Sequence, residues 1–158
     1  MSGRGTPATL LLEREGVPHT VHAYELDAHA GSYGGAVAEA LGVEPERMLK
    51  TLLATVDGRL VCAVVPVAGS LDLKALAGAV GGKRGVMAES AVAERSSGYV
   101  VGGISPLGQR TRLPTVVDET AGLWATVVVS GGRRGLSVEL APADLVRLTG
   151  AVVADVSR

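Results

Sequence analysis

The chain has 158 residues, which suits one domain with a buried core, and we expect residues 1–158 to form a single domain. Hydrophobic residues make up 47% and the mean hydropathy is +0.32, but charged residues recur throughout, which excludes a membrane-spanning run of about 18–20 apolar residues. The N-terminus also lacks a signal-peptide pattern, so we expect a cytoplasmic protein with no membrane contact.

Three elements are predicted before residue 45. A helix begins at Pro7, which suits a first helical position, and ends at Gly16. Residues 19–25 alternate loosely between apolar and polar types and predict a strand. A second short helix opens at Ser32 or Gly34.

Two hairpins follow. The runs 48–56 and 59–66 flank Asp57-Gly58, the strongest short-range hairpin signal. The runs 125–130 and 136–140 flank a turn rich in glycine and arginine, which predicts the second hairpin.

The remaining elements complete an α+β pattern. Helices are predicted over 71–80, 87–94 and 142–149, and strands over 85–87, 115–118 and 152–156. About seven strands and five short helices, joined by hairpins rather than regular βαβ units, predict a curved, mixed and largely antiparallel sheet packed with short helices.

The single cysteine and the three histidines give no sign of a metal site. Cys62 lies in the apolar run 59–66 and is expected to behave as a small core residue, because no histidine or asparagine stands in a partner motif for a nucleophilic cysteine. The histidines form no ligand pattern, and no metal or cofactor is expected.

Lys50 is unusual because it lies between apolar neighbours in a strand that looks central. By strand periodicity Met48, Lys50 and Leu52 share one face. The lysine either extends to solvent at a sheet edge or points into a polar pocket, where it would stabilise a developing negative charge.

The segment Gly102–Gln109 is rich in glycine and has a bend fixed by Pro106. Glycines let backbone N–H groups approach a ligand closely, yet the segment matches neither a Walker loop nor a dinucleotide fingerprint. As a bare pattern it is equally typical of an ordinary structural loop, and the same holds for Ser130-Gly131-Gly132.

Basic residues occur in pairs in the second half of the chain, although the net charge is −1 and no DNA partner is expected. These pairs either form one face that contacts phosphate groups or are scattered solvated charges. They are Lys83 with Arg84, Arg110 with Arg112, and Arg133 with Arg134.

Several motifs together resemble the YbaK-type Cys-tRNA(Pro) deacylases in order and spacing, over nearly the whole chain. The matching segments are 48–53, Pro66–Gly69 with Leu71–Leu73, Gly98–Gln109, Leu113–Thr115 and Ser130–Leu136. The resemblance implies a compact α+β domain with a curved mixed sheet, related to the editing domain of bacterial prolyl-tRNA synthetases.

The resemblance also implies a set of site residues. The family's catalytic lysine falls on Lys50 and its strand tyrosine on Tyr24. The loop that lines the aminoacyl pocket falls on Gly102, Gly103, Ile104, Ser105, Pro106 and Leu107, and a further substrate-binding serine on Ser130. Relatives often have aspartate where this chain has Ser137, and Glu139 on the same strand face is a conceivable substitute.

The implied activity is removal of cysteine from mischarged Cys-tRNA(Pro) in trans, without a cofactor. The substrate's own thiol is thought to attack its ester, which suits a sequence with no recognisable nucleophile–base pair. Aminoacyl-tRNA and, transiently, prolyl-tRNA synthetase are the implied partners. Two alternatives stay open: an Ala-tRNA(Pro) deacylase of the same superfamily, and a non-catalytic module that binds tRNA or the synthetase.

Overall fold

The computed structural model describes residues 5–25 and 33–158. Its helices are α1 (Pro7–Arg14), α2 (Tyr33–Leu41), α3 (Leu73–Ala79), α4 (Ser90–Ser97) and α5 (Pro142–Thr149), with the 3-10 helix η1 (Glu119–Leu123). Its strands are β1 (His19–Ala23), β2 (Leu49–Val56), β3 (Arg59–Pro66), β4 (Gly85–Met87), β5 (Thr115–Asp118), β6 (Val127–Arg133), β7 (Leu136–Leu140) and β8 (Val152–Ala154). The predicted α+β class is confirmed.

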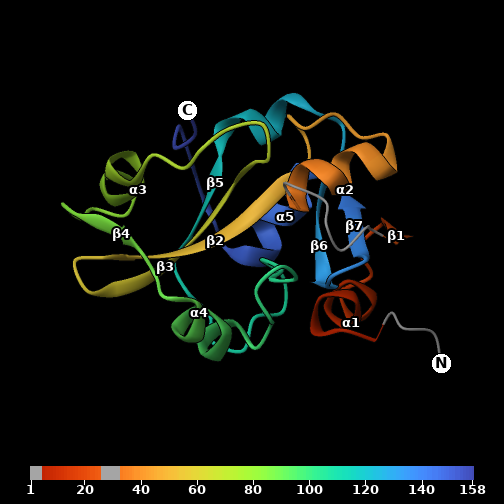
Figure 1. Ribbon diagram of the computed structural model, residues 1–158, viewed down its shortest axis with the longest axis horizontal. Coiled ribbons are helices and arrows are strands. Elements are labelled where there is room, and N and C mark those ends of the chain that lie inside the picture. Colours follow the sequence, from red (N-terminus) through yellow and green to blue (C-terminus); the bar gives the residue numbers. More distant parts are fainter. Residues whose placement is uncertain (1–4, 26–32) are drawn as a thin grey trace.

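The strands form two sheets that lie side by side (Figure 1). A five-stranded sheet has the order β4-β2-β3-β5-β8, with parallel pairs at β3–β5 and β5–β8. A three-stranded antiparallel sheet has the order β1-β7-β6. Both predicted hairpins, β2–β3 and β6–β7, are present. The predicted curved sheet therefore has two parts, which are joined by a parallel bridge between Met48 and Val128.

Two helices start later than predicted: α3 begins at Leu73 instead of Leu71, and α4 shows the larger difference. The helix predicted from Met87 begins at Ser90, because Met87 pairs with Ala54 as the last residue of β4 and Glu89 is still extended. The helix ends at Gly98, which adopts a left-handed conformation suited to a C-cap glycine. Of the two starts predicted for α2, Ser32 lies outside the described residues.

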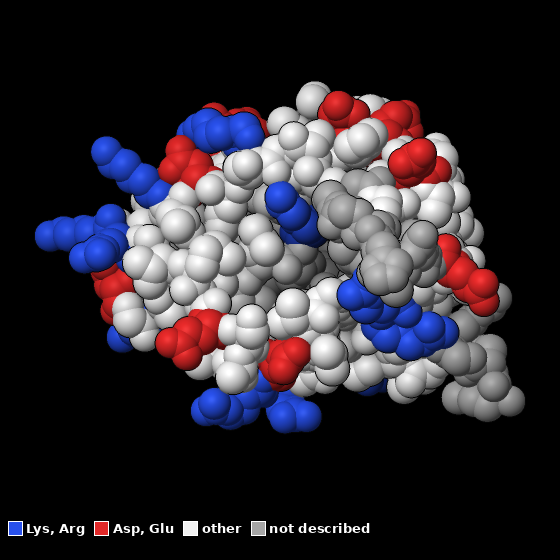
Figure 2. All heavy atoms as spheres, viewed as in Figure 1, with Lys and Arg blue, Asp and Glu red and all other residues white. Residues whose placement is uncertain are grey.

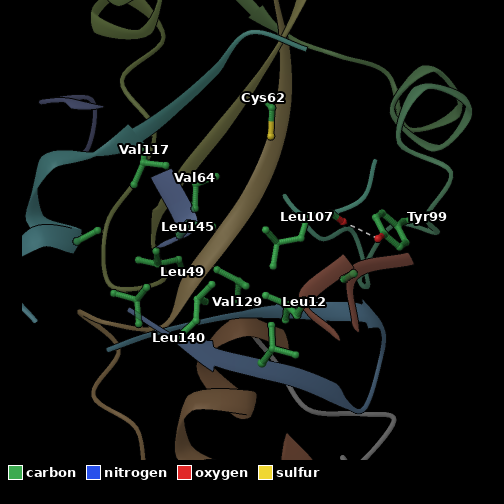
Figure 3. Packing of buried hydrophobic residues seen from close by; sticks show 14 of the residues in the cluster. Leu12, Leu49, Cys62, Val64, Tyr99, Leu107, Val117, Val129, Leu140 and Leu145 are labelled. Carbon is green, nitrogen blue, oxygen red and sulfur yellow. Dashed lines mark hydrogen bonds between the residues drawn. The ribbon is translucent and has the colours of Figure 1, made fainter. Parts of the chain in front are cut away.

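Helices cover both faces of the β2–β3 hairpin. Leu49, Leu53 and Val64 pack with residues of α1, α4 and α5, whereas Ala54 and Val65 pack with α3. Figure 3 shows the first of these clusters, with Cys62 at its upper end and Tyr99 donating a hydrogen bond to the Leu107 carbonyl at 2.6 Å. No helix in the described part of the chain is long and apolar enough to cross a bilayer.

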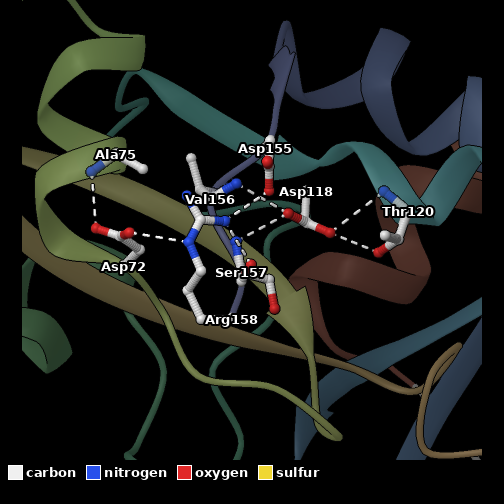
Figure 4. A network of polar contacts seen from close by, with 8 residues as sticks. All are labelled: Asp72, Ala75, Asp118, Thr120, Asp155, Val156, Ser157 and Arg158. Carbon is white, nitrogen blue, oxygen red and sulfur yellow. Dashed lines mark hydrogen bonds and ion pairs between the residues drawn. The ribbon is translucent and has the colours of Figure 1, made fainter.

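A buried carboxylate fixes the C-terminal segment to β5. Asp118 is 1% exposed and accepts hydrogen bonds from the backbone N–H groups of Val156 and Ser157 at 2.9 and 3.0 Å, as well as from Thr120 (Figure 4). Arg158 then pairs at 3.1 Å with Asp72, the N-cap residue of α3. The end of the chain is therefore part of the packed structure.

Replacing Asp118 should destabilise the fold severely. Asp118→Ala leaves buried backbone N–H groups without acceptors, and each such loss costs about 1–3 kcal/mol, so we expect a total of about 3 kcal/mol or more. Asp155→Ala is the matched control, because it removes only an exposed ion pair with Arg158 and should cost less than about 1 kcal/mol. Urea unfolding measures both, and equal losses would contradict the assignment.

Candidate active site

A cavity of about 330 Å³ opens between β2, the segment from Met87 to Ile104, and the β6–β7 hairpin. Figure 2 shows it as a hollow near the centre of one face, bordered mainly by uncharged side chains. Its volume is at the lower end of the range for small-molecule sites. The cavity thus has room for a small group such as an aminoacyl ester.

Lys50 lies on β2, is half-buried, and lines the cavity. Its neighbours Leu49 and Leu53 point into the core between the sheets and α1, α4 and α5, so the alternation of the strand directs Lys50 away from that core. Among the described residues that line the cavity, Lys50 is the one charged side chain. A cation in mainly apolar surroundings is well suited to stabilise an anion.

The bridge between the sheets places Lys50 beside Ser130. Met48 and Val128 pair in parallel, and Lys50 and Ser130 each lie two residues further along their strands. Side chains two residues apart share a face of a strand, and both residues line the cavity. A local pairing between two distant segments therefore brings together two of the residues predicted from sequence.

Three hydroxyl groups face the same cavity. The Tyr24 hydroxyl lies 3.2 Å from Oγ of Ser137, which is completely buried, and Ser137 is the register partner of Ser130. The Gly132 N–H donates a hydrogen bond to Oγ of Ser130 at 3.1 Å. The end of the cavity beside Lys50 is therefore polar but uncharged.

The Gly102–Leu107 loop contributes to the cavity through only part of its length. Gly102 and Ile104 line it, whereas Gly103, Ser105, Pro106 and Leu107 are buried behind its wall. Within that buried part, Ser105 Oγ accepts a hydrogen bond from the Leu107 N–H at 3.2 Å, and the Gln109 amide donates to the Ser105 carbonyl at 3.0 Å.

Gly103 explains why the loop needs glycine. A Cβ atom at this position would lie 2.6 Å from the Cα atom of Arg133, a distance that real Cβ atoms do not reach. The loop and the β6–β7 turn therefore touch backbone to backbone, and this contact closes one wall of the cavity.

The three basic pairs occupy different places. Lys83 and Arg84 donate backbone hydrogen bonds to Asp57 at the tip of the β2–β3 hairpin. Arg110 lies beside Gly98 after α4, and Arg112 beside Gly150 after α5. Arg134 lies against Gly102, with Arg133 next to it. Figure 2 shows separate basic groups around this face rather than one continuous patch.

Glu139 does not line the cavity and is held elsewhere. Its carboxylate accepts hydrogen bonds from Thr126, from His22 at 2.8 Å and from Arg47 at 3.1 Å. These contacts, that of Thr126 first, lower the pKa of Glu139 to about 2. Glu139 therefore joins β7 to β1 and to the segment before β2, and it is not among the residues that line the cavity with Lys50.

Cys62 has no part in the site. It is 1% exposed, and burial raises the pKa of its thiol to about 12. The prediction that Cys62 is a core residue is confirmed.

Sequence reasoning missed one wall of the cavity. The residues that form it, together with Val101, come from β4, from α4 and from the link between them: Met87, Ala88, Ser90 and Ala93. It also missed Thr51, whose hydroxyl is buried and has no hydrogen-bond partner in the part of the chain that the structure describes. By strand alternation Thr51 lies on the face of β2 that carries Leu49 and Leu53, and a buried hydroxyl without a partner is rare in a native fold.

Comparison with known proteins identifies the family. The model of the aminoacyl-tRNA editing domain matches residues 29–148, about three quarters of the chain. The chain belongs to the aminoacyl-tRNA editing domain family. The family predicted from the motif series is thus confirmed.

Individual relatives of this editing domain agree. A protein of Enterococcus faecalis whose name assigns it as a Cys-tRNA(Pro)/Cys-tRNA(Cys) deacylase, EbsC, is 36% identical over 154 residues, which cover 96% of this chain and 93% of that protein. A solved structure described as a trans-editing enzyme for prolyl-tRNA synthetase has a TM-score of 0.86 at 26% identity, covering 100% of this chain and 99% of the other. Another, described only as a hypothetical protein, has a TM-score of 0.85 at 26% identity, covering 97% and 100%.

The Glu139 contacts predict how the stability of this editing domain depends on pH. The folded pKa of about 2 lies below the unfolded value of about 4.3, so the stabilisation is complete above the unfolded value and is lost as pH falls toward 2. The free energy of unfolding should fall between about pH 5 and pH 2 in the wild type and more shallowly in Glu139→Gln. Urea unfolding at a series of pH values measures this free energy. The same pH dependence in the wild type and in Glu139→Gln would contradict the prediction.

Thr51→Val separates a structural from a functional role for the hydroxyl. Removing a buried hydroxyl without a partner should raise the free energy of unfolding by about 1 kcal/mol. If the hydroxyl also contacts the aminoacyl group, kcat/KM for deacylation should fall. Reduced stability would show that the hydroxyl has a partner in the folded protein, and unchanged kcat/KM would exclude contact with the substrate.

Proposed function

We propose that the protein is a trans-editing deacylase that releases cysteine from mischarged Cys-tRNA(Pro). Membership of the aminoacyl-tRNA editing family and the likeness to EbsC support the reaction class and the substrate. The observation on which the proposal chiefly rests is the position of Lys50, a single cation in an otherwise uncharged cavity of aminoacyl size.

Lys50 supplies electrostatic stabilisation. When an ester carbonyl is attacked, its oxygen becomes negative, and a cation already in place stabilises that oxygen without reorganisation. The effect is greater here than in bulk water because Lys50 is half-buried and the residues lining the cavity are mainly apolar. Lys50 is thus the catalytic residue of the proposed site.

The substrate thiol supplies the nucleophile. The sulfur attacks the ester carbonyl carbon, a carbon–sulfur bond forms, and the carbon–oxygen bond to the tRNA ribose breaks. The thiol proton ends on the released ribose hydroxyl, and the amino acid leaves as a cyclic thioester. The enzyme then needs only to orient the ester and stabilise charge, which agrees with the buried, protonated state of Cys62.

The remaining cavity residues orient the aminoacyl group. Tyr24, Ser130 and Ser137 present hydroxyls at the polar end, and Gly102 and Ile104 form the opposite wall. Gly103, Ser105, Pro106 and Leu107 hold that wall in place from behind. In this proposal Ser137 takes part as a neutral hydrogen-bonding group bound to Tyr24.

Editing in trans requires the protein to meet mischarged tRNA after its release from the synthetase. The proposed partners are therefore aminoacyl-tRNA and, in a transient complex, prolyl-tRNA synthetase, in the cytoplasm where charging takes place. One small domain spanning the whole chain is sufficient for this task.

Lys50→Ala should abolish deacylation of Cys-tRNA(Pro). The loss of charge stabilisation is expected to lower kcat by about a hundredfold or more, with an unchanged far-ultraviolet circular dichroism spectrum. Lys74→Ala is the matched control, because Lys74 is exposed on α3 and does not line the cavity. Retained activity in Lys50→Ala would contradict the role of Lys50, and tRNA binding without deacylation by the wild type would favour a non-catalytic module.

Ser-tRNA(Pro) tests the thiol mechanism. Its hydroxyl is a poorer attacking group than a thiol at neutral pH, so its ester should be cleaved far more slowly than the Cys ester. Equal rates in a single-turnover assay would argue for direct attack by water.

A further inference from the structure

The mouth of the cavity has an apolar side and a basic side. On the apolar side, Val101 and Met87 line the cavity yet are 47% and 48% exposed, and Val100 is 72% exposed. Large apolar side chains in solvent at the rim of a pocket are typical of a contact surface. These three residues, Met87, Val100 and Val101, are called the apolar rim below.

The apolar rim is held in place by hydrogen bonds. The Val101 N–H donates to the Glu94 carboxylate at 2.8 Å, and the Gly103 N–H donates to the Val100 carbonyl at 2.8 Å. This turn is therefore fixed to α4 with its valine side chains directed outward. A preorganised surface loses little entropy when it binds a flat apolar group.

The basic side is formed by Arg133 and Arg134 in the β6–β7 turn. A Cβ atom built on Gly102 would lie 3.4 Å from Cδ of Arg134, so the arginine side chain runs along a residue that lines the cavity. Both arginines are exposed. Figure 2 shows a basic group above the hollow, a larger one to its lower right, and others at the left and lower edges of the same face. The residues of the other basic pairs, Lys83, Arg84, Arg110 and Arg112, do not line the cavity.

We propose that the terminal adenosine of aminoacyl-tRNA binds across this mouth, with its adenine on the apolar rim and its 5′-phosphate at Arg133 and Arg134. The inference rests on the proposed function, because an aminoacyl ester inside the cavity places its ribose at the mouth. A cavity of about 330 Å³ accepts the aminoacyl group and leaves the nucleotide outside. The nucleobase then needs an apolar surface and the phosphate a cation, and the mouth offers both.

The test uses two ligands that cannot be hydrolysed. Each is a cysteinyl-adenosine with an amide in place of the ester, one with and one without a 5′-phosphate. For the wild type, the phosphate should tighten binding about tenfold or more, as expected for a charge-assisted contact. Arg134→Ala should remove most of this gain, and Arg133→Ala/Arg134→Ala all of it, in calorimetric Kd measurements. The double variant Lys83→Ala/Arg84→Ala removes the same charge at the hairpin tip and should keep the gain.

The apolar rim is tested with the same ligands. Val101→Ser should weaken binding of both ligands by the same factor of about five or more, whereas Leu123→Ser, at a 79% exposed position outside the cavity, should change neither. The proposal is overturned if the phosphate gives no gain in the wild type, if the gain survives loss of both arginines, or if Val101→Ser has no effect. Deacylation of Cys-tRNA(Pro) by the wild type tests the proposed function separately, since binding of the amides needs no catalysis.

Discussion

The parallel bridge between Met48 and Val128 is the contact on which the site depends. It joins the edge of the three-stranded sheet to the start of β2, and the Val128 N–H reinforces it by donating to the Arg47 carbonyl at 3.0 Å. Lys50 and Ser130 lie two residues beyond the bridge on their strands, and both line the cavity. The ion pair of Arg47 with Glu139 at 3.1 Å also joins the segment before β2 to β7 of the three-stranded sheet.

The ion pairs of Glu139 lie at the junction of the two sheets, whereas the cavity has Lys50 as its one described charged lining residue. At the junction of the sheets, Glu139 pairs with Arg47 and His22, and its contacts lower its pKa to about 2. The polar side chains described as lining the cavity are hydroxyl groups and one lysine. An acid beside Lys50 would pair with it and compete with the developing charge of a substrate. The neutral Ser137 at this position is consistent with a site that positions an ester and stabilises an anion.

The sequence predicted the fold through local signals and the site only in part. Turn residues such as Asp57-Gly58, together with helix caps, located both hairpins and most helices, because these features act within a few residues. The junction of the two sheets depends on the long-range pairing of Met48 with Val128, which no local pattern encodes. Lys50 was identifiable as a charge in an apolar strand. Thr51 and the α4 wall were not, because a threonine in a strand and an alanine in a helix look like ordinary structural residues until the cavity is seen.

Release of the amino acid from Cys-, Ala- and Pro-tRNA(Pro) by the wild-type protein is the measurement that tests the account most directly. A small cavity with one lysine and no acid among its described lining residues predicts rapid release of cysteine, slower release of alanine and no release of proline. Faster release of alanine than of cysteine, or release of none of the three, would contradict the account.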